Sequence, residues 1–163
     1  VTISVDTREE YDDNIETADR IARDCQLEPK EIIAKISAAG IVGMGGATFP
    51  THVKLSVPDG KVAEYLIING VECEPYLTAD HRVMLERSEE LLIGTRTLAR
   101  ALCAGIIIIG IENNKPLPNE ALGRVGGRVA PALGIIPLKV KYSQGGEKHH
   151  TAAHTRCPVP AGG

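Results

Sequence analysis

The sequence has very few aromatic residues and no long hydrophobic run. Tryptophan is absent and phenylalanine occurs once, so aromatic residues make up 3 % of the chain. The longest continuous apolar stretch, residues 106–109, has the length of a strand and is far too short to cross a bilayer. We therefore predict no direct membrane span.

The sequence also lacks an excess of basic residues and the spacings typical of metal ligands. The net charge is −3, whereas a nucleic-acid-binding protein needs a basic surface, so no nucleic-acid partner is predicted. The four cysteines are far apart and form no C-x-x-C pair, which argues against zinc or iron–sulfur ligation. Cys103 is expected to be a reduced core residue. His150 and His154 have helical spacing, but no third ligand accompanies them, so no metal site is predicted. The chain also begins without the pattern of a signal peptide.

Residues 1–34 are interpreted as an acidic lead-in and residues 35–163 as one domain. Residues 1–30 hold nine Asp or Glu against four Lys or Arg. Pro29 and the apolar stripe at 32, 33, 36 and 39 predict a helix that stops at Gly40. The remaining length is sufficient for a single domain with a proper core.

Strand and helix signals alternate along that domain. Apolar runs at residues 65–68, 106–111 and 135–142 predict strands. Helices are expected near residues 78–85, from an N-cap at Ser88 to a stop at Gly105, and over residues 119–130. Strands that alternate with helices through short turns predict an α/β fold, with an open, mostly parallel sheet and helices on both faces. Ligands of such sheets bind beyond the carboxyl ends of the strands.

The stretch from Gly43 to Lys54 is the first candidate binding loop. It reads Gly-Met-Gly-Gly-Ala-Thr-Phe-Pro-Thr-His-Val-Lys and offers flexible glycines, a flat aromatic face at Phe49 and a single lysine. Bare amides in a tight loop, followed by a helix N-terminus, favour a nucleotide or flavin phosphate. The pattern fits neither the P-loop nor the dinucleotide fingerprint, so an ordinary glycine-rich turn remains open as an alternative.

Two further candidates follow predicted strands. Asn69, Glu72 and Glu74 come directly after the first strand, where amide and carboxylate groups can bind the polar edge of a ligand. A solvated turn is the alternative for these residues. Gly145 and Gly146, followed by Glu147, form a second glycine-rich turn of the same kind as the first candidate loop. A simple turn is equally compatible with these residues. Cys73 lies between two glutamates, which favours a packing role over reactivity.

Four ordered motifs together resemble a known family. They are G43-x-GGA-x-FPT-x-x-K54, IIN69-x-x-ECEPY-x-TAD80, GIENNKP over residues 110–116, and KY142-x-x-GG-x-K148. This set resembles the C subunit of the Rnf electron-transport complex, the ion-translocating ferredoxin:NAD oxidoreductase. It is equally similar to the related cobalamin reductase of microcompartments, and both resemble the flavin- and NADH-binding subunit of respiratory complex I. The resemblance covers about residues 35–163.

The resemblance implies a Rossmann-like domain that holds FMN and receives hydride from NADH. The residues expected to bind FMN are Gly43, Gly45, Gly46, Lys54, Asn69, Glu72, Tyr142, Gly145, Gly146 and Glu147. Phe49 and Glu74 are expected to face NADH, and no protein group is expected to be catalytic because the cofactor carries the reaction. Thr48 replaces a small residue of the family and is expected to crowd the ligand. Val71 replaces an acid of the complex I relatives.

The same resemblance implies partners and a place in the cell. The iron–sulfur clusters that take electrons from the flavin are expected in downstream domains, and the other proteins of the complex are expected partners. The domain is expected to be cytoplasmic, either at the cytoplasmic face of a membrane complex or inside a microcompartment. A module that keeps the fold but docks a partner protein without catalysis is the alternative.

Overall fold

The computed structural model describes residues 20–44, 47–74, 76–129 and 133–140, together with Thr151 and Thr155. Five helices and three strands lie in these residues: α1 Pro29–Ala38, α2 Thr51–Lys54, β1 Tyr65–Gly70, α3 Ala79–Glu86, α4 Ser88–Leu102, β2 Ile106–Glu112, α5 Pro116–Val129 and β3 Leu133–Leu138. No helix among them is both long enough and apolar enough to cross a bilayer.

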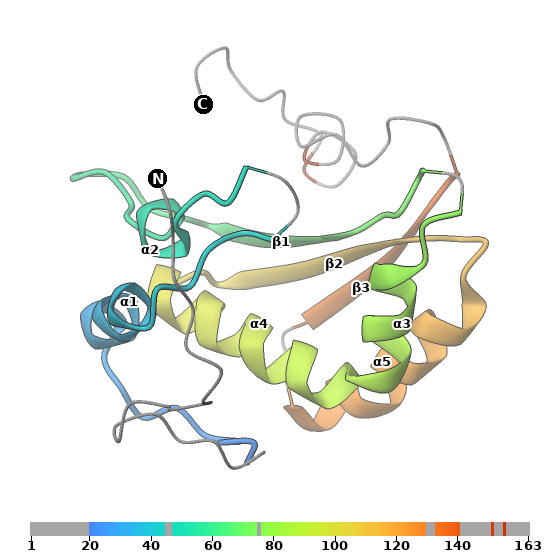
Figure 1. Ribbon diagram of the computed structural model, residues 1–163, viewed down its shortest axis with the longest axis horizontal. Coiled ribbons are helices and arrows are strands. Elements are labelled where there is room, and N and C mark those ends of the chain that lie inside the picture. Colours follow the sequence, from blue (N-terminus) through green and yellow to red (C-terminus); the bar gives the residue numbers. More distant parts are fainter. Residues whose placement is uncertain are drawn as a thin grey trace, which may run out of the picture.

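The three strands form one parallel sheet in the order β1-β2-β3 (Figure 1). Ile68 of β1 and Ile135 of β3 both pair with Ile109 of the central strand β2. From its second residue onward β2 is buried, which is why its sequence is a continuous apolar run rather than an alternating one. The predicted open parallel sheet with helices is confirmed.

Helices α3, α4 and α5 pack together against one face of the sheet (Figure 1). Their buried side chains, Met84, Leu92 and Leu122, meet Ile109 and Ile111 of β2 in the main core cluster. Successive side chains of a strand alternate between the two faces, so Ile109 and Ile111 define the face that these helices cover.

Helices α1 and α2 lie at the end of the sheet where β1 and β2 begin (Figure 1). Ile32 of α1 and Leu55, which caps α2, form a second cluster with Ala101 of α4. Cys25 and Leu27 pack on the same cluster, and the predicted boundary at residue 34/35 falls inside α1. The predicted helix stop is confirmed, since Gly40 follows α1 with a φ of +63°, which glycine adopts without a steric penalty.

Several local predictions are wrong. Ser88 is not an N-cap, because its hydroxyl donates backward to the Met84 carbonyl at 2.5 Å while Arg87 occupies the cap. Helix α4 ends before Gly105, with Cys103 in the left-handed region at a φ of +54°. Cys103 is also exposed rather than part of the core. Helix α5 begins at Pro116 instead of residue 119, and β3 runs over residues 133–138 instead of 135–142.

Gly70 gives a direct test of the strand packing. A Cβ at this position would lie 3.0 Å from the Gly110 carbonyl oxygen and 3.2 Å from the Met84 sulfur. Overpacking of this kind costs about 1–3 kcal/mol, so Gly70→Ala should lower the free energy of unfolding in urea by that amount. The matched control is Gly94→Ala in α4, where a Cβ meets nothing within 4 Å and the change should add about 1 kcal/mol of stability. Equal effects of the two substitutions would contradict the close approach of β1 and β2.

Candidate functional site

The glycine loop is closed by backbone bonds on both sides of its tip. Val42 and Pro50 form an antiparallel bridge, and the Gly43 N–H donates to the Phe49 carbonyl at 2.9 Å. The Thr51 N–H donates to the Ile41 carbonyl at 3.0 Å, which places the start of α2 beside the start of the loop. Residues 41–43 are therefore held beside residues 49–51 at the base of the loop.

Lys54 folds back from α2 over this loop. Its Nζ lies 5.9 Å from the centroid of the Phe49 ring, within the range of a cation–π contact. A Cβ on Gly43 would lie 3.3 Å from the same Nζ, so the glycine leaves the space that the ammonium occupies. The structure thus brings Gly43, Phe49 and Lys54 together, although the Gly43 amide is already used inside the loop.

Thr48 adopts a conformation that suits glycine better than threonine. Its φ is +53°, in the left-handed region that a β-branched residue rarely enters. The residue lies directly before Phe49, so its side chain projects from the same turn as the ring. This conformation accompanies the departure from the family pattern that the sequence shows at this position.

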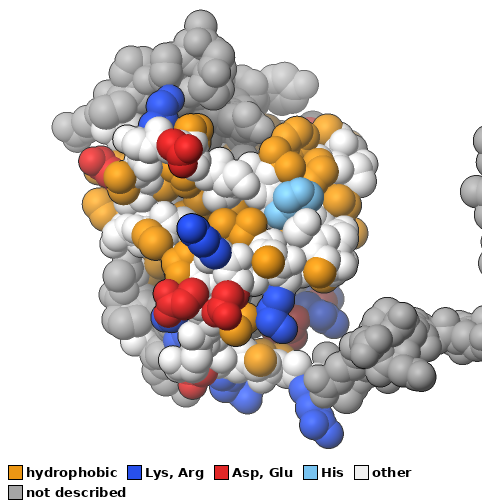
Figure 2. Space-filling model, turned by 90° about the vertical axis from the view of Figure 1, so that its left-hand side faces the viewer, with side chains coloured by type: hydrophobic (Ala, Val, Ile, Leu, Met, Phe, Trp, Pro, Cys, Tyr) orange, Lys and Arg blue, Asp and Glu red, His pale blue; other side chains and the backbone are white. Residues whose placement is uncertain are grey.

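Apolar side chains are exposed around the loop. Met44 is 95 % exposed, and Phe49 and Val53 are each 45 % exposed. Figure 2 shows hydrophobic groups, basic groups and a histidine interspersed on the face of the molecule at the α1 and α2 end. Exposed apolar groups beside a cationic side chain are typical of a ligand or partner surface rather than of a plain turn.

Asn69, Glu72 and Glu74 lie at the carboxyl end of β1, at the opposite end of the sheet from α2 (Figure 1). Asn69 accepts a hydrogen bond from the Val71 N–H at 3.2 Å through its side-chain oxygen, which shapes the turn after the strand. Glu74 is exposed, whereas Glu72 is buried.

Glu72 is held by a lysine to which the sequence motifs assigned no role. Lys115 Nζ lies 2.9 Å from one Glu72 oxygen, and the Asp80 N–H donates to the other at 3.0 Å. Burial of the carboxylate acts to raise the pKa of Glu72. The hydrogen bond from Lys115, the Asp80 N–H and the charge of Lys115 outweigh it, so the pKa lies below its ordinary value.

Glu112, at the end of β2, faces the same lysine. One Glu112 oxygen lies 3.6 Å from Lys115 Nζ, and the other has no hydrogen-bond partner among the described residues. The signal that could have found this group is present in the sequence. Lys115 stands three residues after Glu112, the last residue of β2, and Glu72 lies two residues after the end of the neighbouring strand β1.

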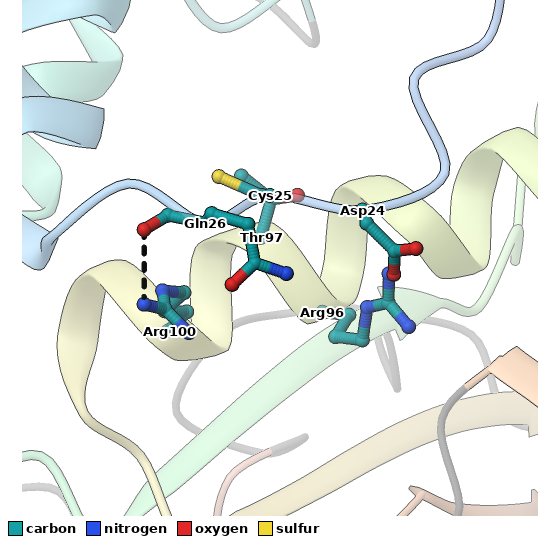
Figure 3. A pocket seen from close by; sticks show the side chains of 6 residues that line it. All are labelled: Asp24, Cys25, Gln26, Arg96, Thr97 and Arg100. Carbon is teal, nitrogen blue, oxygen red and sulfur yellow. Dashed lines mark hydrogen bonds and ion pairs between the residues drawn. The ribbon is translucent and has the colours of Figure 1, made fainter.

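A separate hollow lies between residues 24–26 and α4. It measures about 290 Å³ and is lined by Asp24, Cys25, Gln26, Arg96, Thr97 and Arg100 (Figure 3). Arg100 donates to the backbone carbonyls of Leu27 and Gln26, and Arg96 donates to Asp24 at 3.1 Å. These arginines hold the segment before α1 against α4, and none of the predicted site residues lines this hollow.

Six predicted site residues lie outside the described residues. They are Gly45 and Gly46 of the first loop and Tyr142, Gly145, Gly146 and Glu147 of the second. His150 and His154 lie outside as well. The roles of all these residues stay predictions.

The pairing of Glu72 with Lys115 predicts a specific pH dependence of stability. Because the pKa of Glu72 is lowered on folding, its stabilising contribution is full above the unfolded pKa of about 4.3 and is lost as pH falls through the folded pKa. In urea unfolding between pH 7 and pH 3, the stability difference between the native chain and Glu72→Gln should be constant down to about pH 5 and then shrink.

The matched control for this prediction is Glu120→Gln, which removes an exposed pair with Arg124. Its effect should stay within about 0.5 kcal/mol at every pH, as for other exposed helix pairs. A Glu72→Gln difference that does not change with pH would contradict the pairing.

Comparisons with known proteins agree with this architecture. The family described as the Nuo51 FMN-binding domain matches residues 36–163. The C subunit of the proton-translocating ferredoxin:NAD(+) oxidoreductase complex of Clostridium ljungdahlii is 41 % identical over 165 residues, covering 100 % of this chain and 35 % of that protein. The C subunit of the ion-translocating oxidoreductase complex of Rhodobacter capsulatus is 46 % identical over 133 residues, covering 82 % of this chain and 26 % of that protein.

A solved structure has the same fold. The NAD+-reducing [NiFe]-hydrogenase in its air-oxidized state matches with a TM-score of 0.68 and 28 % identity over 74 % of this chain and 22 % of that chain. The chain thus spans about a third or less of the curated relatives named here. The match over residues 36–163 and these relatives confirm the resemblance to the Rnf protein and its relation to complex I. The chain belongs to the family of the Nuo51 FMN-binding domain.

Proposed function

We propose that this chain is the FMN-binding domain of an electron-transfer oxidoreductase and that it receives hydride from NADH. The observation that carries the proposal is the loop in which Lys54 lies over Gly43 and Phe49. The family match over residues 36–163 supports FMN as the ligand. The hydrogenase named above, which reduces NAD+, supports a nicotinamide nucleotide as the second ligand.

The residues present fit an anionic, planar cofactor. Lys54 would hold the phosphate, and a side chain at position 43 would fill the space that its ammonium occupies. Asn69 would bind the polar edge of the ring from the carboxyl end of β1. Phe49, with nearly half of its surface exposed, and the exposed Glu74 would face the nicotinamide nucleotide.

The protein's part in this reaction is binding and orientation. When bound, FMN supplies the chemistry, because its ring accepts two electrons from a hydride donor and releases them singly to an acceptor. The chain's own residues would exclude water and hold the two ring systems in contact. We propose that the electrons leave to iron–sulfur clusters in downstream domains or in partner proteins, at the cytoplasmic face of a membrane complex or in a microcompartment.

The test is a flavin titration followed by reduction. FMN fluorescence should be quenched on adding the purified chain, and NADH should bleach the bound flavin at 450 nm (roughly the flavin absorption band) under anaerobic conditions. Quenching without NADH-dependent bleaching would support FMN binding but contradict hydride transfer from NADH. A folded chain that does not alter FMN fluorescence would contradict the proposal.

A docking module without catalysis is the second candidate. The exposed side chains of Met44, Phe49 and Val53 favour it, because the same apolar groups can bind a protein. The two candidates differ in one measurable respect. FMN should protect Lys54 from acylation if the loop binds the cofactor, whereas a docking surface gives Lys54 the same reactivity with and without FMN.

Lys54→Ala gives the sharpest residue-level prediction. A charge-assisted contact contributes on the order of 1.5–3 kcal/mol, so the dissociation constant for FMN should rise by about tenfold or more. Lys61→Ala is the matched control, since Lys61 is an exposed lysine in the turn after α2 and should leave the affinity unchanged. Equal dissociation constants for the two variants in a fluorescence titration would remove Lys54 from the site.

A further inference from the structure

Lys115 joins two buried carboxylates, Glu72 from the segment after β1 and Glu112 from the end of β2. Its ammonium lies 2.9 Å from a Glu72 oxygen and 3.6 Å from a Glu112 oxygen. The three side chains are 13 %, 4 % and 2 % exposed, in the order Lys115, Glu72 and Glu112. Charges that are this well removed from water are costly unless they are paired, so the arrangement is not a solvated surface bridge.

The lysine reaches the segment after β1 through Glu72. The second Glu72 oxygen accepts the N–H of Asp80, in the first turn of α3. Lys115 therefore fixes Glu72, and Glu72 fixes the junction between the strand and α3. Residues 73–74 and 76–78 lie in sequence between these two points, and they include Glu74, which the proposed function places toward NADH.

The presence of Glu112 indicates that the cluster of Lys115, Glu72 and Glu112 does more than balance charge. Two carboxylates share one ammonium, and a Glu112 oxygen is buried without a partner among the described residues. A buried ion pair needs only one carboxylate for its lysine, and an additional buried negative charge lowers stability. Glu112 is therefore best explained by its effect on where the ammonium sits, on the side of β2 that faces Glu72.

We propose that Lys115 is a positioning residue: held by Glu112, it keeps the Glu72 carboxylate against the Asp80 N–H and so sets the conformation of residues 71–74 and 76–78 for ligand binding. This inference rests on the proposed function. Glu72 is faced by Lys115, by the backbone N–H groups of Asp80 and His81, and by the Asp80 carboxyl group. Of these groups, Lys115 is the cation that favours the ionised form of Glu72.

The inference predicts how ligand affinity depends on pH. With Lys115 present, Glu72 stays ionised to below its ordinary pKa, so FMN affinity should be constant from pH 8 to about pH 5. Without Lys115, burial favours the protonated form of Glu72, and a protonated carboxyl loses one of its acceptor oxygens. The acid limb of the affinity profile should then move to higher pH.

The experiment compares Glu112→Gln with the double variant Lys115→Met/Glu112→Gln. The single variant keeps the pair between Lys115 and Glu72, and the double variant removes the lysine without leaving both carboxylates unpaired. FMN dissociation constants are measured by fluorescence from pH 5 to pH 8. At pH 6 the double variant should bind FMN at least about tenfold more weakly than Glu112→Gln does, and it should regain affinity toward pH 8.

A second measurement separates this inference from the proposed function. Amide hydrogen exchange of the flavin-free chain should be faster at Asp80 by about tenfold in the double variant than in Glu112→Gln, with no change at Ile109 in β2. Equal exchange at Asp80 in the two variants, or equal affinity profiles, would overturn the positioning role of Lys115. If the native chain does not bind FMN, the proposed function fails, and the exchange rates alone decide the role of Lys115.

Discussion

The parallel pairing of β1 with β2 is the constraint on which the rest of the structure depends. It sets Gly70 beside Ile111 and therefore brings the carboxyl ends of the two strands to one place. A buried glutamate lies at this end of each strand, Glu72 two residues after β1 and Glu112 as the last residue of β2, and two like charges in a buried site need a cation between them. Lys115, at the turn before α5, supplies it.

The same pairing separates the face of the sheet that packs against helices from the end of the sheet where polar groups gather. One face of the sheet is filled by aliphatic side chains of α3, α4 and α5, so it is available for stability and not for ligands. The polar groups gather at the carboxyl end of the strands, while the glycine loop and Lys54 approach from the α2 end. The proposed function requires one ligand to reach both groups, and a nucleotide meets this requirement better than a small anion.

The sequence predicted the elements whose signal is local. Strand β2 was predictable because a buried parallel strand is a continuous apolar run. The end of α1 was predictable because glycine readily adopts the positive φ that Gly40 has in the structure. The start of α5 was placed too late because the helix begins with Pro116 and Pro118, and proline breaks a helix interior but is tolerated in the first turn. Cys103 was misjudged because the helix ends at a left-handed cysteine and turns its side chain toward solvent.

The site was predictable only in part, because sequence shows residue types and not the contacts between distant segments. Gly43, Phe49 and Lys54 were grouped correctly because they lie in one short stretch. The bond between Lys115 and Glu72 joins residues 43 positions apart. The sequence therefore shows the motif that contains Lys115 but not the pairing of Lys115 with Glu72. The same limit applies to Arg96 and Arg100, whose bonds reach back more than 70 residues to the segment before α1.

Amide chemical shifts of the chain, recorded with and without FMN, test the central claim most directly. The claim is that the glycine loop and the carboxyl end of β1 form one binding site. It predicts that the amides of Gly43 and Phe49 shift together with those of Val71 and Glu72 at the same FMN concentration, while amides of α5 do not move. Shifts confined to one of the two segments, or a different saturation concentration for each, would contradict it.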